Sequence, residues 1–185
     1  FNWDEASQWY RLRSQSQPSR SQTAQAPWGK YALRIEKTNK SNDTISQPIT
    51  NAQIIPLREK TVTLGAWMWA DKVTKVKLPQ LKYALYPKET GRSTPKAITL
   101  TNTPAFYRLT FKIPYASEEA WVVLTPFTTA TPENVKIYYD GIVLAEGEYL
   151  QGEPHFQDSN ATFGTWNEKP FKNLIGHRFH HHSSL

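Results

Sequence analysis

The feature that most constrains the fold of this chain is an alternation of apolar and polar side chains with a period of two residues. Successive side chains of a β-strand point to opposite faces, so this period predicts half-buried strands rather than amphipathic helices. In residues 31–36, Leu33 and Ile35 share one face, while Arg34 and Glu36 share the other. The same reasoning predicts further strands over residues 61–69, 81–86, 106–113, 121–125 and 135–144.

The segments between these strands are rich in turn-forming residues. Thirteen Pro and eight Gly are spread along the chain, and no segment keeps an apolar stripe of helical period beyond about two turns. Many short strands with little helix are typical of sandwiches and barrels. We therefore expect an all-β fold, a jelly-roll β-sandwich of two antiparallel sheets with an irregular C-terminal tail.

The alternation stops near residue 150, which suggests a division of the chain. We expect one β-sandwich module over 1–150 and an irregular tail, or a linker to a following module, over 151–185, with Phe156, Phe163, Trp166 and Phe171 as spaced anchors. The chain opens at Phe1 without an initiating Met or a basic-then-apolar leader. We interpret it as a segment of a larger protein, and the His residues near its end as a cloning remnant or a frayed terminus.

Composition excludes several classes of function. The chain has no Cys, which removes disulfides, thiolate metal sites and cysteine nucleophiles. It has no run of eighteen apolar residues, so we expect no direct membrane insertion. Absence of Cys is common in exported bacterial proteins, although the cytosol tolerates it too.

The net charge of +6 raises the question of a polyanionic partner. The basic residues are scattered, and one group, Lys72, Lys75, Lys77 and Lys82, is interleaved with apolar residues as on the wet face of a strand. A solvated strand face is the favoured interpretation and contact with a polyanion the alternative, because phosphate binding needs a clustered patch. We expect no nucleic-acid partner.

Taken in order, several sequence pieces resemble a known family. A start of the form F-x7-W spans 1–9, and G-x-Y-x-L-x-I follows at 29–35. V-T-x-x-A-W-x-x-A-D begins at Val62, an aromatic-opened strand ends at Pro114, and Y-x-D-G-I-x-L spans 138–144. This series resembles the jelly-roll carbohydrate-binding modules of families four, nine and twenty-two, which are attached to xylanases and related hydrolases, and the wider galactose-binding-like β-sandwiches.

The C-terminal residues carry a second resemblance. Residues 156–175 resemble linkers between tandem modules of large bacterial surface or membrane-anchored proteins. Together the resemblances imply a non-catalytic carbohydrate-binding module of a larger, extracytoplasmic and bacterial protein, with a polysaccharide or glycan and neighbouring domains as partners. The alternative is a structural spacer or protein-interaction module in a surface or membrane-anchored multidomain protein, for example a glycosyltransferase ectodomain.

Sugar binding needs an aromatic surface flanked by polar groups that bond hydroxyls. Trp67 and Trp69 stand two residues apart on one strand, so their side chains share a face about 7 Å apart. The alternative is that they pack inside the protein, as an aromatic residue at the position of Trp67 does in the resembling family. Of the neighbours Tyr138 and Tyr139, only one can share any given face. Further candidate ligand-binding residues are Arg34, Glu36, Tyr86 and Arg108.

The resemblance also implies a structural calcium ion, held by an acidic residue near the first strand and an Asp in the last. Asp140 matches the second position, whereas Asn2 stands at the first. Calcium prefers six to eight oxygen ligands, some of them carboxylates. The alternative is that Asp140 caps the turn before Gly141.

Catalysis has little support in the sequence. A glycosidase needs two carboxylates set across the sugar, and Glu36 with Asp140 is the only natural strand-borne pair. The sequence has no Gly-rich phosphate loop, nucleophile elbow or paired-His metal motif. We predict that the chain is not an enzyme.

Overall fold

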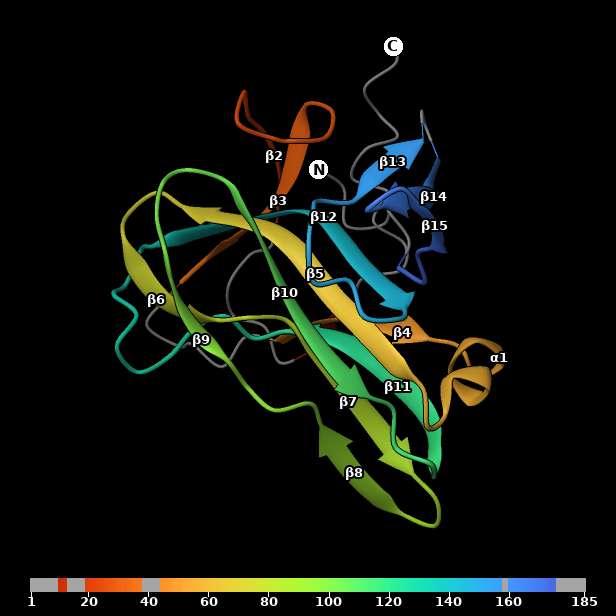
Figure 1. Ribbon diagram of the computed structural model, residues 1–185. Coiled ribbons are helices and arrows are strands. Elements are labelled where there is room, and N and C mark those ends of the chain that lie inside the picture. The colour runs from red at the N-terminus through yellow and green to blue at the C-terminus, as the bar shows by residue number, and fades with distance from the viewer. Residues whose placement is uncertain (1–9, 13–18, 38–43, 158–159, 176–185) are drawn as a thin grey trace.

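The computed structural model describes residues 10–12, 19–37, 44–157 and 160–175. These residues form two five-stranded antiparallel sheets that pack face to face, so the predicted all-β sandwich is confirmed (Figure 1). No helix among them is long and apolar enough to cross a membrane.

The first sheet contains β1 (Tyr10–Leu12), β4 (Thr44–Ile49), β11 (Ser117–Leu124), β7 (Gln80–Leu85) and β8 (Glu89–Arg92), in that spatial order. The second sheet contains β10 (Ala105–Lys112), β5 (Thr61–Ala70), β12 (Lys136–Glu146), β3 (Tyr31–Glu36) and β2 (Ser19–Gln22). A small pair, β6 (Thr74–Lys77) and β9 (Ala97–Leu100), extends one end of the sandwich. Between β4 and β5 lie the short helix α1 (Asn51–Ile54) and a 3-10 turn, Ile55–Leu57.

The core lies between the two sheets and follows the alternation. In β5, Leu64, Ala66 and Met68 point into it and are essentially inaccessible to solvent. On β12 the inward residue of the tyrosine pair is Tyr139, which is fully buried, while Tyr138 faces the opposite side of the sheet. Burial raises the pKa of the Tyr139 phenol well above its usual value.

Some elements have weaker sequence signals. Strand β4 contains Pro48, which cannot donate a backbone hydrogen bond and so masks a strand pattern. Residues 117–120 lie ahead of the strand expected from residue 121, yet they begin β11, and Ala120 packs into the core there. Helix α1 begins with a capping box in which Thr50 and Gln53 exchange hydrogen bonds.

The C-terminal residues differ from the irregular tail that the sequence suggested. They form a three-stranded antiparallel sheet of β13 (His155–Gln157), β14 (Asn160–Trp166) and β15 (Lys169–Lys172). This C-terminal sheet lies against the outer face of the second sheet, where Trp166 and Phe171 pack on Val143 and Ala145 of β12. Apolar partners on the sandwich, rather than period-two alternation in the tail itself, explain why these residues are ordered.

Polar bonds fix the same junction. The Trp166 indole N–H donates to the carbonyls of Gln151 (3.1 Å) and Gly152 (2.9 Å). Asn173 accepts from the Leu144 N–H (2.9 Å) and donates to the Ile142 carbonyl (3.1 Å), both on β12. The C-terminal residues are therefore tied to the sandwich by side chains that are themselves buried.

A bulge in β12 separates the two halves of its outer face. The pairing with β5 shifts register between Asp140 and Val143, and Gly141 there has a φ of +53°. A Cβ on Gly141 would lie 2.9 Å from a Trp28 ring atom and 3.1 Å from a Trp67 ring atom. Only glycine fits this left-handed and crowded position.

We expect Trp166→Ala to lower the free energy of unfolding by about 3–5 kcal/mol, because it empties a fully buried aromatic position. Phe163→Ala is the matched control, since Phe163 lies on the same strand but is 48% exposed. Urea unfolding of the full chain measures both. Equal effects of the two substitutions would show that Trp166 does not anchor the C-terminal sheet.

We expect Gly141→Ala to destabilise the protein by about 2–4 kcal/mol, because it adds left-handed strain to overpacking against two rigid indole rings. Thermal unfolding monitored by near-UV circular dichroism reports both the stability and the Trp packing. A variant as stable as the parent would mean that the bulge does not have this geometry.

Candidate functional site

The outward-facing side chains of the second sheet form a surface that we call the Trp67 face. The strand pairings place on it Arg108 of β10, Trp67 and Trp69 of β5, Tyr138 of β12, and Arg34 and Glu36 of β3. Five of the six ligand-binding candidates from the sequence therefore share one face. The sixth, Tyr86, follows β7 of the first sheet and is 69% exposed.

The two tryptophans of this face differ in accessibility. Trp69 is 1% exposed, and its ring stacks on Tyr138 with centroids 5.3 Å apart and planes 5° apart. Trp67 is half-buried and meets Phe106 edge-on, with centroids 6.1 Å apart. Neither belongs to the core cluster between the sheets. Trp67 and Tyr138 therefore expose part of their rings to solvent. Trp69 is buried and stacks on the Tyr138 ring.

Both indoles of β5 carry a buried hydrogen-bond donor. Nε1 of Trp67 and Nε1 of Trp69 have no acceptor among the residues that the structure describes. Buried side-chain donors in proteins are nearly always hydrogen-bonded, so two exceptions on one face are unusual. Of the two, only Trp67 has a partly exposed ring, whereas Trp69 is 1% exposed.

A loop reaches over one end of the Trp67 face. The residues between β2 and β3 lie at one side of the second sheet, yet the Gln25 side chain donates to the Asn102 carbonyl just before β10 at the other side (3.0 Å). In the same loop the Trp28 N–H donates to the Asp140 carboxylate (2.9 Å). The Trp28 ring also lies edge-on to His155 of the C-terminal sheet. The loop and the C-terminal sheet therefore border the open part of the face.

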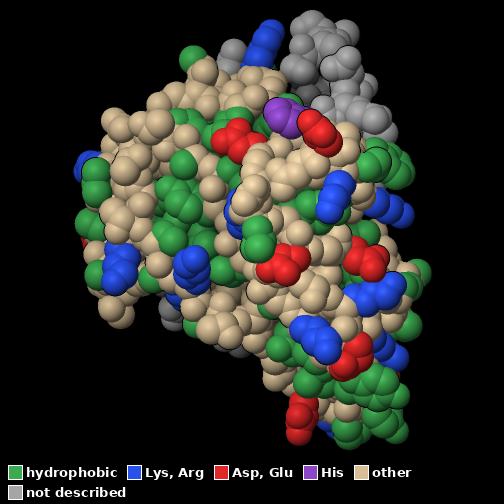
Figure 2. Space-filling model, viewed as in Figure 1, with side chains coloured by type: hydrophobic (Ala, Val, Ile, Leu, Met, Phe, Trp, Pro, Cys, Tyr) green, Lys and Arg blue, Asp and Glu red, His purple; other side chains and the backbone are tan. Residues whose placement is uncertain are grey.

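The polar candidates lie along the margin of that open part. Arg34 and Tyr138 are directly opposite each other on β3 and β12, and Glu36 is opposite Lys136. Arg34, Glu36 and Arg108 are all half-buried. Figure 2 shows hydrophobic side chains gathered over the upper ends of β5 and β10, with basic side chains nearby. Donors and acceptors thus flank an aromatic surface.

The outer face of the first sheet is a separate surface. Trp121 of β11 points away from the core, and the Lys82 ammonium lies 5.9 Å from its ring centroid. Tyr86 adjoins this sheet, where its backbone N–H donates to the Ala116 carbonyl (3.0 Å). The sequence grouped Tyr86 with the tryptophans of β5 because spacing alone does not tell which sheet a strand joins.

Asp140, the predicted calcium ligand, is fully buried. One carboxylate oxygen accepts the Gly141 N–H and the other accepts the Trp28 N–H, each at 2.9 Å. This is the turn-capping geometry that the sequence left as the alternative. Asn2, the other predicted ligand, lies outside the described residues. The described residues contain no group of three or more His, Cys, Asp or Glu side chains that could hold a metal ion. Calcium also accepts backbone and amide carbonyl oxygens as ligands, so calcium at Asp140 stays a prediction.

Glu36 and Asp140 share the Trp67 face but do not form a glycosidase pair. Glu36 stands opposite Lys136, four residues along β12 from Asp140, so the Cα atoms of the two acids are about 13 Å apart along the strand direction. Catalytic carboxyl pairs lie about 5–9.5 Å apart. In addition, both oxygens of Asp140 already accept backbone hydrogen bonds. These two acids are not arranged for hydrolysis of a sugar.

The sequence left open whether Tyr138 or Tyr139 faces the site, and it did not predict Phe106 or Trp28 there. The orientation of Tyr138 depends on which side of β12 faces the core, and the adjacent Tyr139 is the same residue type. Phe106 looked like an ordinary strand residue, yet its ring joins Trp67 to Trp166 of the C-terminal sheet. Trp28 stands in the loop before β3, and its sequence position gives no sign of a place in the site. Its nearness to Gly141, far along the chain, is the signal that only the fold supplies.

Comparison with known proteins gives similarity in structure rather than in sequence. No family model matches the chain, and no curated protein matches it either. The CBM22-1 xylan-binding domain of Xyn10C from Paenibacillus barcinonensis superposes with a TM-score of 0.58 at 11% identity, over 75% of this chain and 85% of that domain. A CBM4 structure matches with a TM-score of 0.53 at 12% identity, over 79% of this chain and all of that one.

A third match comes from a different context. The enzymatically active domain of tailspike protein 4 from bacteriophage CBA120 gives a TM-score of 0.56 at 11% identity, over 76% of this chain. This chain spans only 20% of that tailspike chain. At such low identities the likeness shows the fold alone. The chain is therefore structurally similar to the family 22 and family 4 carbohydrate-binding modules and has their β-sandwich fold.

Proposed function

We propose that this chain is a non-catalytic glycan-binding module of a larger, extracytoplasmic bacterial protein, and that it holds a polysaccharide against the Trp67 face. Trp67 and Tyr138 provide ring surface for the apolar side of a sugar. Arg34, Glu36 and Arg108 flank them and bond hydroxyl groups.

The observation that carries the proposal is the indole donor of Trp67, which has no partner among the described residues and lies beside partly exposed aromatic rings. Trp67 and Trp69 each have an Nε1 that is shielded from solvent and lacks an acceptor among the described residues. A donor left in this state costs free energy, about 1–3 kcal/mol, which is recovered when an acceptor arrives. Sugar hydroxyls and ring oxygens are such acceptors, and the aromatic rings beside them suit the C–H face of a pyranose.

The comparisons support the same class of ligand. The module from Paenibacillus barcinonensis is a xylan-binding domain, and this chain covers most of its length. A polysaccharide such as xylan is too large to cross a cell membrane. We therefore place the module outside the cytoplasm. We expect a Kd between millimolar and micromolar, because few stacking contacts must offset the ordering of a flexible glycan.

One observation favours a second candidate, a structural spacer or protein-interaction module. Trp166 and Phe171 cover Val143 and Ala145, so part of the Trp67 face is already occupied by the C-terminal sheet. In a spacer the remaining aromatic surface would contact a neighbouring domain. The two candidates differ in one measurable property. Only a glycan-binding module is retarded in a gel that contains a soluble polysaccharide.

Affinity electrophoresis in gels containing soluble xylan or other soluble polysaccharides tests the proposal. We expect the parent chain to be retarded and Trp67→Phe to weaken binding roughly tenfold, because the substitution removes a hydrogen-bond donor that the ligand uses. The fold should remain intact, since the Trp67 N–H bonds no described protein atom.

Trp121→Phe is the matched control, a change of the same kind at a half-buried tryptophan on the other sheet. It should bind as the parent does. Equal weakening by the two substitutions would contradict the assignment of the Trp67 face. A parent chain that no polysaccharide retards would instead favour the spacer.

A further inference from the structure

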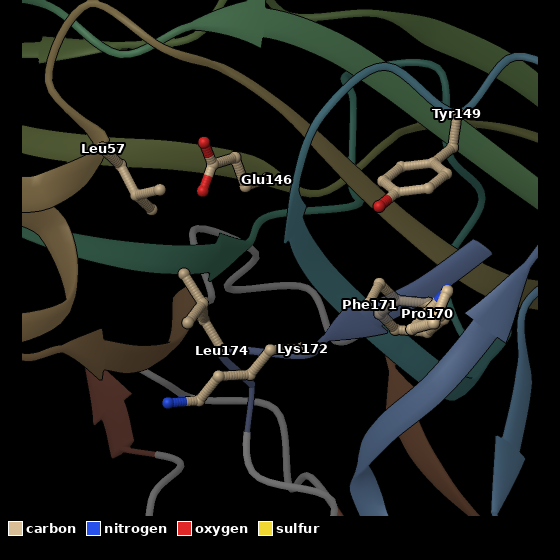
Figure 3. A pocket seen from close by; sticks show the side chains of 7 residues that line it. All are labelled: Leu57, Glu146, Tyr149, Pro170, Phe171, Lys172 and Leu174. Atoms are coloured by element: carbon tan, nitrogen blue, oxygen red, sulfur yellow. The ribbon is translucent and has the colours of Figure 1, made fainter.

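A cavity of about 460 Å³ opens between the C-terminal sheet and the end of the sandwich. It lies beyond the covered part of β12, at the end of that strand opposite to the Trp67–Tyr138 region, since Glu146 is the last residue of β12. Its volume falls in the range of small-molecule sites, about 300–1,000 Å³. Figure 3 shows its lining.

The floor of the cavity is apolar and firmly held. Leu57 and Phe171 are 5% and 6% exposed, and Leu174 is half-buried between them and β12. Leu57 and Leu174 point into the same space from opposite sides (Figure 3). The Leu174 N–H donates to the Leu144 carbonyl (2.8 Å), so the segment after β15 that carries this side chain is fixed on the sandwich. The floor therefore exists before any ligand arrives.

The rim of the cavity offers both acceptors and donors. Glu146 supplies a carboxylate, which pairs with Lys60 at 3.2 Å while both side chains stay about half exposed. Lys172 supplies an exposed ammonium on the other side. Tyr149 closes one wall, where burial and, to a lesser extent, the Glu146 carboxylate raise its pKa. The phenol is therefore a neutral O–H group at physiological pH.

This mixture selects a class of ligand. A simple anion would meet the Glu146 carboxylate, and a simple cation would meet Lys60 and Lys172. A purely apolar ligand would strip water from all three charges without replacing their hydrogen bonds. A sugar ring avoids these costs, because its hydroxyls donate to a carboxylate and accept from an ammonium while its C–H face covers aliphatic side chains.

We propose that this cavity is a second sugar site, which binds one pyranose unit over Leu57 and Leu174 with its hydroxyls bonded to Glu146 and Lys172. The class of ligand rests on the proposed function, whereas the site uses no residue of the Trp67 face. The C-terminal sheet thus builds a site as well as covering part of the sandwich.

Titration of the isotope-labelled full chain with methyl β-D-xylopyranoside, followed by methyl β-D-glucopyranoside, tests the proposal by NMR. We expect saturable shifts of backbone amides at 144–149 and 171–174 with a millimolar Kd. Lys172→Met and Glu146→Gln should each weaken this binding roughly tenfold, because each removes a charged hydrogen-bond partner. Both residues are exposed, so neither change should disturb folding.

Lys169→Met and Glu148→Gln are the matched controls, since both residues are exposed near the cavity but do not line it. They should bind as the parent does. If Lys169→Met weakened binding as much as Lys172→Met, the weakening would come from the change in net charge, and the site would be overturned. Shifts confined to residues 67–69 and 138 would overturn it while leaving the proposed function in place. Absence of shifts in both regions would overturn it as well, and polysaccharide retention would then decide the proposed function separately.

Discussion

The structure depends on the burial of β12 on both of its faces. On the inner face, Ile137, Tyr139 and Leu144 pack into the core between the sheets. On the outer face, Val143 and Ala145 pack under the C-terminal sheet. A strand buried on both sides ties the sandwich to the C-terminal sheet, and both candidate sites lie at its ends. Apolar burial stabilises a fold by about 25 cal/mol per Å². Both clusters contain residues of β12, so the packing on each side of this strand helps to hold it in place for the other.

The bulge at Gly141 connects that packing to the Trp67 face. It lets Asp140 and Val143 face the same side of the sheet despite their odd spacing. Asp140 then holds the Trp28 loop over one half of the face, and Val143 receives the C-terminal sheet on the other half. Trp67, opposite Asp140, and Tyr138, beyond it along β12, keep partly exposed rings.

Most of the sandwich could be predicted from the sequence. The strands around Leu33, Leu64, Leu109 and Ile137 follow from alternation, because burial of one sheet face imposes it. Strand β4 was harder because Pro48 interrupts its pattern. Residues 155–172 could not be recognised as strands, since the apolar surface that orders them belongs to a distant part of the chain.

The sequence by itself determined the all-β class, and it showed that Trp67 and Trp69 share one face of their strand, as Arg34 and Glu36 share one face of theirs. Only the strand pairings bring these residues and Arg108 to the same sheet face. Alternation and residue type are local properties, so a single strand already carries them. Only the tertiary structure decided that Trp69 is buried against Tyr138, that Tyr86 belongs beside the other sheet, and that Asp140 caps a turn. Exposure and hydrogen-bond partners depend on segments far apart in the chain, and only the packed fold brings these together.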